Sequence, residues 1–262
     1  MSQTDASTNV RSLPDLVARI RSEPRMQAVL ESLRRGESGT IDGAWGSACA
    51  LAAAALAEGS TTAEQASDNR DAGPLSGGTD HSSRRCLLII LPRISDIDDF
   101  AVDVMSFLGR PPTMFPAWES LPTEHVVSDQ IFGARLKVLS EIESASPPAV
   151  IVTSLPALLQ PVPSRESRDA STRTLRVGED LDLESLLQWL VERGFERESA
   201  IERPGEFAVH GGILDVFPPD AEDPLRIELF GDEIESIRSF DVETQRKVED
   251  LRETKLTVLA PP

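Results

Sequence analysis

The chain has 262 residues, of which 40% are hydrophobic, so it can bury the core of one large domain or of two modest ones. It carries 44 acidic and 26 basic residues, and the formal net charge of -18 opposes binding of the whole chain to nucleic-acid phosphates. These properties exclude a fibre, a disordered tail and a nonspecific nucleic-acid binder.

The cysteines and the first residues indicate the compartment. Cys49 and Cys86 form no CxxC pair and lie near no histidine cluster, so we expect neither a disulfide framework nor a metal site. The chain begins without the basic and apolar segments of a signal peptide, and no apolar run approaches the roughly 20 residues of a membrane span. We therefore expect a soluble, cytoplasmic protein that binds no membrane.

Helical patterns dominate the first part of the chain. Apolar residues recur at helical spacing from Leu13 to Leu33, with Pro24 at the start of the second run, which predicts two short helices. An alanine-rich run from Ser47 to Leu56 predicts a third. Residues 58–83 contain almost no large apolar side chain, and we interpret them as a mobile, disordered insertion.

A glycine loop precedes the third predicted helix. Helix N-termini favour phosphate groups, but a P-loop also needs a lysine and a following Ser or Thr hydroxyl. After Gly43 and Gly46, these two positions hold Cys49 and Ala50. We interpret the loop as a degenerate P-loop with no cofactor, and a plain tight turn before a core helix is the alternative.

Two apolar runs predict the strands of an α/β domain. Cys86–Leu91 and Ala149–Thr153 have the continuous apolar pattern of central parallel strands that are covered on both faces. Between them, helical patterns cover Asp96–Leu108 and Gln130–Ile142, with breaker residues after the first. This alternation predicts an α/β layer domain.

A smaller domain is predicted beyond the polar stretch Gln160–Ser171. Thr172–Val177 predicts a strand, and Asp180–Arg193 predicts a helix. Short strand patterns follow at Phe207–Val209, Ile213–Phe217, Leu225–Phe230 and Glu233–Phe240, the last two joined by a Gly231-Asp232 hairpin signal. Together these patterns predict an α+β domain with an antiparallel sheet.

We accordingly divide the chain into five parts. They are the helices and glycine loop (1–57), the insertion (58–83), the rest of the α/β domain (84–157), the α+β domain (158–245) and the start of a return to the α/β domain (246–262). The return is expected because Leu256–Leu259 resembles a strand that completes the α/β sheet.

Charge is concentrated in the second domain. Val177–Glu253 holds 22 acidic and 8 basic residues, a net charge of -14, and most of these acids are expected on a solvated surface. Arg197, Arg203 and His210 break the acidic pattern. From composition alone they are either members of surface ion pairs worth under about 1 kcal/mol or partner contacts.

The segments Pro204–Pro218 and Leu225–Asp241 resemble the UvrA-interaction domain shared by UvrB and the bacterial transcription-repair coupling factors (Mfd). Phe115–Pro122 resembles the coupling-factor segment that precedes the helix into this domain. The resemblance implies a partial RecA-like parallel-sheet domain with a degenerate P-loop, joined to an α+β domain like UvrB domain 2. UvrB resembles a working ATPase with a tyrosine-rich hairpin, and this chain has no tyrosine, which favours the coupling factors.

The resemblance implies a UvrA-binding adaptor that recruits nucleotide excision repair to RNA polymerase stalled at DNA damage. The family protein is an ATP-dependent DNA translocase whose motor, with its ATP, and whose contacts with RNA polymerase and DNA would lie outside this chain, so we expect no enzyme activity here. The alternatives are a P-loop ATPase of the UvrB type, or a module that masks the UvrA surface within its own protein.

The resemblance also implies a partner surface. It consists of Arg197, Arg203 and His210 as charge partners and Phe207 as an apolar anchor, although Phe207 is equally compatible with a core position. UvrB has two arginines on the strand where this chain has Ala208 and His210. Because histidine is only partly charged near neutral pH, one basic contact is kept, one is weakened and one is lost.

Overall fold

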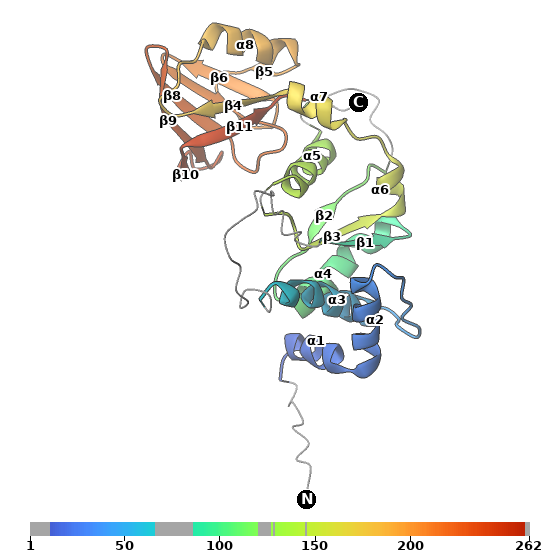
Figure 1. Cartoon of the computed structure of the whole chain (residues 1–262). Helices are drawn as coiled ribbons and strands as arrows, with labels where there is room; N and C mark the ends of the chain where they lie inside the picture. The colour runs from blue at the N-terminus through green and yellow to red at the C-terminus, as the bar shows by residue number, and fades with distance from the viewer. Residues whose placement is uncertain (1–10, 66–85, 120–126, 128, 145, 260–262) are drawn as a thin grey trace, which may run out of the picture. The chain divides into compact units, whose positions relative to one another are not determined.

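The computed structural model describes residues 11–65, 86–119, 127, 129–144 and 146–259. The chain divides into two compact units, whose elements are labelled in Figure 1. Unit 1 runs up to Phe115 and includes Glu141–Leu158, and unit 2 comprises Pro116–Ser140 and the chain from Leu159 onwards. Pro116–Ser140, placed with the α/β part by sequence, therefore groups with the C-terminal unit, while the five-part division stays a prediction.

Three helices begin unit 1. α1 (Leu13–Ser22) and α2 (Pro24–Arg34) each have a proline in the first turn, where no backbone N–H donor is needed. α3 (Ser47–Gln65) is alanine-rich, and its small side chains pack in the core of the unit. Residues 58–65 are helical rather than part of an insertion, because extending an alanine-nucleated helix costs little. The rest of the predicted insertion lies outside the described residues.

The predicted parallel sheet is confirmed in unit 1. Its strands are β1 (Leu87–Leu91), β2 (Thr113–Phe115) and β3 (Val150–Ser154), in the order β1-β3-β2. β3 is central and buried throughout, as predicted. β1 is an edge strand among the described strands, and Leu88 and Ile90 are 48% and 50% exposed, so the expectation of two covered faces is wrong for β1.

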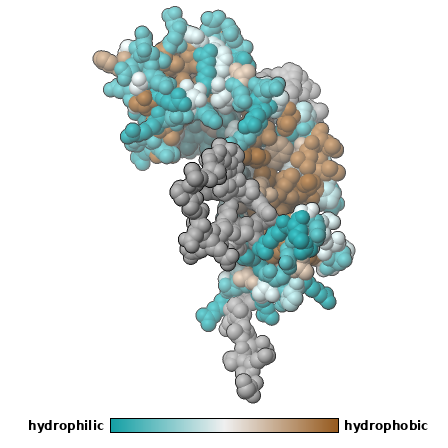
Figure 2. Space-filling view, in the orientation of Figure 1, coloured by the Kyte–Doolittle hydropathy of each residue, from teal (hydrophilic) through white to brown (hydrophobic). Residues whose placement is uncertain are grey.

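Helices cover one face of this sheet. The short η1 (Ile94–Asp96) leads into α4 (Ile97–Leu108), which ends at Gly109 in the left-handed conformation. α4 packs with α3 against side chains of β1 and β3. Figure 2 shows hydrophobic side chains at the surface over β1 and α6 (Leu155–Leu159), consistent with the exposed Leu88 and Ile90.

Unit 2 contains the predicted antiparallel sheet. Its strand order is β10-β9-β8-β7-β6-β5, and only β5 runs parallel to its neighbour. The strands are β5 (Glu196–Arg197), β6 (Glu206–His210), β7 (Ile213–Val216), β8 (Leu225–Phe230), β9 (Glu233–Phe240) and β10 (Lys247–Leu251). The Gly231-Asp232 hairpin between β8 and β9 is confirmed.

A second, two-stranded sheet changes one expectation. β4 (Thr172–Arg176) pairs antiparallel with β11 (Glu253–Thr257). Leu256 is therefore a core residue of unit 2, and the expected return of Leu256–Leu259 to the α/β sheet is wrong. The apolar pattern indicated burial, but it did not specify which sheet the segment joins.

The core of unit 2 lies between the six-stranded sheet and α8 (Leu183–Glu192). Asp182 caps α8 by accepting a hydrogen bond from the Ser185 backbone N–H, and Leu186 and Leu190 are fully buried against the sheet. The short α7 (Arg165–Ala170) precedes β4 within the stretch predicted to be a linker. This packing fixes which face of the sheet is covered.

A buried arginine helps to hold α5 (Gln130–Ile142) within unit 2. The Arg135 guanidinium donates to the Pro116 carbonyl oxygen at 2.7 Å, and it reaches the carbonyl oxygens of Gln160 and Pro161 at 3.4 and 3.3 Å. Burial lowers the pKa of Arg135 to about 10. A Cβ at Gly133 would lie 2.1 Å from the Pro219 carbonyl oxygen, so only glycine permits this close contact. These contacts explain why Pro116–Ser140 groups with unit 2.

Candidate partner-binding surface

The six-stranded sheet has two chemically different faces. Phe207 and Val209 of β6 point toward α8, so Ala208 and His210 point to the opposite side. We call this second side the polar face. The strand register places on it Ala208, His210, Ile213, Asp215, Arg226, Glu228, Ser236 and Arg238, and Phe240 packs with Ala208 on the same side.

Ion pairs occupy the centre of the polar face. Arg226 donates through Nε and Nη2 to the two Asp215 carboxylate oxygens at 2.6 and 2.7 Å, and its guanidinium lies 4.4 Å from the Phe240 ring centroid. The hydrogen bonds to Asp215 raise the pKa of Arg226. Glu228 accepts hydrogen bonds from Arg238 and Ser236. These charges satisfy one another, so their first role is to stabilise the sheet.

Two hairpin turns meet at one end of the sheet. The Leu229 N–H donates to the Gly212 carbonyl oxygen at 2.7 Å, which joins the β6–β7 turn to the end of β8. Phe230, at the tip of the β8–β9 hairpin, is 80% exposed. Aromatic side chains are enriched at protein interfaces, so Phe230 is a candidate contact residue.

His210 and Arg197 extend this surface toward the edge of the sheet. The His210 Nε2 lies 2.8 Å from the Ser199 carbonyl oxygen, which connects the end of β6 to the segment after β5. Arg197 is exposed on β5, and no carboxylate in the described part of the chain pairs with it. We define the docking surface as Arg197, His210 and Phe230.

Arg203 has a different environment. Its guanidinium pairs with the buried Glu206 at 2.9 Å, and Glu206 also accepts from the backbone N–H groups of Glu202 and Arg203. Burial alone raises the pKa of Glu206, but these hydrogen bonds and the Arg203 charge outweigh it and lower the pKa. Arg203 therefore stabilises a buried carboxylate, although much of its side chain remains exposed.

Phe207 is a core residue. It is 1% exposed and packs with the α8 leucines, so it cannot act as an exposed anchor, and the core interpretation is the correct one. Phe230, which the sequence interpretation did not select, has the exposure that an anchor needs. Its position directly before the Gly231-Asp232 turn was the available signal, because residues at hairpin tips are usually exposed.

The glycine loop of unit 1 lacks the chemistry of a triphosphate site. Gly43 and Gly46 have positive φ values of 79° and 54°, which glycine adopts without strain. The Cys49 thiol donates to the Ala44 carbonyl oxygen at 3.4 Å, and Ala50 is fully buried in the core. The residues at the lysine and hydroxyl positions therefore do not fit a magnesium-bound nucleotide phosphate.

Within the described residues, no group of three or more His, Cys, Asp or Glu side chains is placed to hold a metal ion. No helix in this part of the chain is long and apolar enough to cross a membrane.

Comparison with known proteins identifies the domain. Residues 174–259 match the family model described as the UvrB interaction domain. The chain is 35% identical over 172 residues to the transcription-repair-coupling factor of Mycobacterium bovis, a match that covers 63% of this chain and 14% of that protein. It is 36% identical over 177 residues to the coupling factor of Staphylococcus aureus strain bovine RF122, covering 67% of this chain and 15% of the relative. Residues 174–259 are therefore similar to the UvrB interaction domain, in a chain that is similar over about two thirds of its length to the transcription-repair-coupling factors.

Proposed function

We propose that this chain is a UvrA-binding adaptor module of a transcription-repair-coupling factor. In this role it recruits nucleotide excision repair to RNA polymerase stalled at DNA damage. The observation that carries the proposal is the UvrB interaction domain match over residues 174–259, which include every residue of the docking surface. The resemblance of this domain to the UvrA-interaction domain of UvrB supplies the partner.

Backbone contacts connect the segments that carry the docking residues. Arg197 lies on the edge strand β5 in register with Phe207, and it lies two residues before Ser199, whose carbonyl oxygen contacts His210. Gly212 lies two residues after His210, and its carbonyl oxygen accepts from Leu229, the neighbour of Phe230. His210 and Phe230 therefore lie near one end of the sheet, and Arg197 lies at its β5 edge. Exposed aromatic and arginine side chains are among the residue types that contribute most to protein interfaces.

Charge sets the character of the partner. Residues 177–253 carry a net charge of -14, and Arg197 and His210 are the basic side chains of the docking surface, with the exposed Glu196 and Glu198 on either side of Arg197. In this acidic surrounding, the two basic side chains are the groups that would contact carboxylates of a partner. We propose that Arg197 and His210 contact carboxylates of UvrA and that Phe230 enters an apolar pocket beside them.

We assign the other activities of the family protein to parts of it that this chain does not include. The chain spans about one seventh of the relatives that it matches, since the matches cover 14% and 15% of their lengths. We propose that unit 1 neither binds nor hydrolyses ATP, and that ATP-driven translocation and binding to RNA polymerase and DNA reside elsewhere in the family protein. Equilibrium titration with a fluorescent ATP analogue tests nucleotide binding, and saturable binding would contradict the first point.

Calorimetric titration of the chain with UvrA tests the adaptor function. We expect Arg197→Glu to raise the dissociation constant by about tenfold or more, because it places a carboxylate against an acidic partner. Arg252→Glu is the matched control, since it makes the same change of charge at another exposed arginine of unit 2. Equal losses in both variants would indicate nonspecific electrostatics, and unchanged binding by Arg197→Glu would remove Arg197 from the interface.

A further inference from the structure

β1 leaves one edge of the parallel sheet of unit 1 open. Its inner side pairs with β3, and no other strand that the structure describes pairs with its outer side. The Leu87 N–H donates to the Ala149 carbonyl oxygen at 2.9 Å, toward β3. Because successive residues of a strand direct their backbone groups to opposite sides, those of Leu88 and Ile90 point to the open edge. Their side chains are about half exposed, so the edge presents both hydrogen-bonding groups and aliphatic surface.

The edge strands of the six-stranded sheet are protected where β1 is not. β10, at one edge, has an irregular register and exposes the charged side chains of Lys247, Glu249 and Asp250. β5, at the other edge, consists only of the two charged residues Glu196–Arg197. Charged side chains, bulges and short strands are the usual protection of an edge against pairing with another chain. Residues 86–92, which contain the whole of β1, have no charged side chain.

The exposed aliphatic surface extends beyond β1. Ser154, the last residue of β3, lies opposite Leu91, and α6 begins directly after it. Leu155 and Leu158 of α6 are also about half exposed. Figure 2 shows the hydrophobic surface over β1 and α6. An exposed apolar patch beside an open strand edge is typical of an interaction surface.

The sequence of β1 makes this edge complementary to a second copy of itself. When two β1 strands lie antiparallel about Ile89, Leu88 of each lies opposite Ile90 of the other, and Leu87 lies opposite Leu91. Each Leu88 and its opposite Ile90 then exchange two backbone hydrogen bonds, because their N–H and C=O groups already point to the edge. Their side chains meet on the exposed face as aliphatic cross-strand pairs. Proline, which has no N–H, follows directly at position 92 and ends the pairing without leaving a donor unpaired.

We propose that the chain forms a two-fold symmetric dimer through β1. The two parallel sheets join into one continuous sheet, in which the β1 strands are antiparallel neighbours at the centre. Both copies use the same surface, as a closed dimer requires. The interface is small, so we expect a dissociation constant in the micromolar range. The proposal is independent of UvrA binding, because the docking surface lies in unit 2.

Sedimentation equilibrium of the whole chain tests the proposal. We expect the mean molar mass to rise from 28.5 kDa toward twice this value between low micromolar and submillimolar concentration. A reductant keeps Cys49 and Cys86 as thiols, so that a disulfide-linked dimer is not counted. A mass that stays at the monomer value, as it would if another part of the chain covered the β1 edge, would overturn the proposal. Growth beyond a dimer would overturn it too, because a two-fold contact closes.

A charge at the edge should prevent the association. We expect Ile90→Lys to raise the dissociation constant of the dimer by at least about tenfold, because it places a charge of each copy beside the paired strands. Val102→Lys is the matched control, since Val102 is 56% exposed on α4, which covers the opposite face of the sheet, and it should dimerise like the wild type. Unchanged dimerisation in a folded Ile90→Lys would overturn the proposal.

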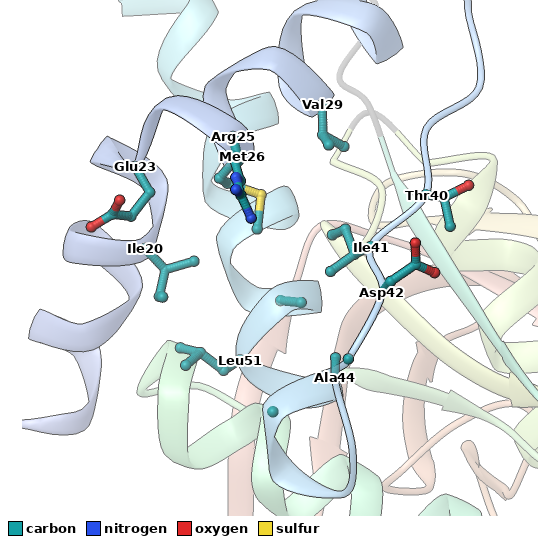
Figure 3. Close-up of a pocket in the computed structure, with 13 residues that line it drawn as sticks. Ile20, Glu23, Arg25, Met26, Val29, Thr40, Ile41, Asp42, Ala44 and Leu51 are labelled. Atoms are coloured by element: carbon teal, nitrogen blue, oxygen red, sulfur yellow. The ribbon is translucent and has the colours of Figure 1, made fainter.

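A cavity of about 500 Å³ in unit 1 supplies a second control. Figure 3 shows its lining, which includes Ile20, Met26 and Ile41, and none of the lining residues belongs to β1. Ile41 is 39% exposed, and Ile41→Ser removes apolar surface from this cavity alone. It should leave the dimer intact. Loss of the dimer in Ile41→Ser but not in Ile90→Lys would place the association at the cavity and contradict the proposal.

Hydrogen exchange needs no substitution, so it decides the question if Ile90→Lys does not fold. Raising the concentration until the mass doubles should slow exchange of the Leu88 and Ile90 amides by about tenfold, because these N–H groups become bonded across the two-fold axis. The Leu87 amide, which already bonds to Ala149, should change much less. Equal exchange of Leu88 and Ile90 at low and high concentration would overturn the proposal.

Discussion

The backbone N–H of Leu229 donates to the carbonyl oxygen of Gly212 at 2.7 Å, and a Cβ at Gly212 would lie 2.7 Å from the Leu229 carbonyl oxygen. The two backbones therefore approach each other more closely than any residue other than glycine allows. This contact joins the turn that follows His210 to the strand end that carries Phe230. The docking surface depends on it for its shape.

Gly212→Ala should distort this contact. We expect the free energy of unfolding to fall by about 2 kcal/mol, because the added Cβ forces the two backbones apart. UvrA affinity should fall as well, since His210 and Phe230 lose their relative positions. Urea unfolding and calorimetry measure the two effects. Gly36→Ala is the control, because the positive φ of Gly36 strains an alanine but no atom lies within 4 Å of the added Cβ. This control should bind UvrA with unchanged affinity.

The Arg226–Asp215 pair should contribute more than an exposed pair. The two side chains are 21% and 11% exposed, so Asp215→Asn leaves a largely buried guanidinium without its carboxylate. We expect a loss of about 2–3 kcal/mol in the free energy of unfolding. The Arg176–Glu253 pair is about half exposed, so Glu253→Gln should change the free energy of unfolding much less than Asp215→Asn does. Equal costs for the two variants would contradict this assignment.

Asp220 should make the chain less stable at neutral pH than at acidic pH. Burial raises the pKa of Asp220, against the opposing hydrogen bonds from its own backbone and from Thr257. The folded state then keeps the proton to a higher pH than the unfolded state, so this contribution to stability is lost as the pH rises through the raised pKa. Asp220→Asn should therefore increase the free energy of unfolding at pH 7. The gain should disappear below about pH 4, where the carboxyl is protonated in both states.

Glu206 should show the opposite dependence. Its lowered pKa means that its stabilising contribution is present above the ordinary pKa of glutamate and is lost as the pH falls through the folded-state pKa. Glu206→Gln should reduce the free energy of unfolding by about 1–3 kcal/mol at pH 7, with a smaller difference in acid. Urea titrations between acidic and neutral pH, followed by tryptophan fluorescence, measure the stability of both variants. Parallel pH profiles for the two variants would refute this pair of predictions.

The sequence was sufficient to predict most elements, because their apolar spacing is local. The strands from β6 to β9 and the helices α4 and α5 lie where their patterns indicated. Burial that depends on tertiary packing was harder to predict. Phe207 begins one predicted strand and Phe230 ends another. Phe207 is covered because its side chain packs against α8, whereas Phe230 is exposed. Leu256 was recognised as apolar, but its pairing with β4 depends on a contact between distant segments.

The docking residues were predicted from resemblance rather than from pattern. Arg197 and His210 are exposed as expected, yet Arg203 pairs with a buried glutamate that no sequence spacing revealed as its partner. Whether these residues contact UvrA stays a prediction. The strand pattern did not single out Phe230, because the alternation of side chains does not specify which face is covered, and only its position before the Gly231-Asp232 turn indicated exposure.

Titration of the chain and of its Phe230→Ala variant with UvrA tests the central claim most directly. We expect Phe230→Ala to raise the dissociation constant by about tenfold or more. Its free energy of unfolding should change little, because Phe230 is 80% exposed. Val248→Ala is the control, since Val248 is 56% exposed on β10 at the opposite edge of the sheet from β5, and it should bind UvrA like the wild type. Wild-type affinity in Phe230→Ala, or no binding of UvrA by the wild-type chain, would contradict the account.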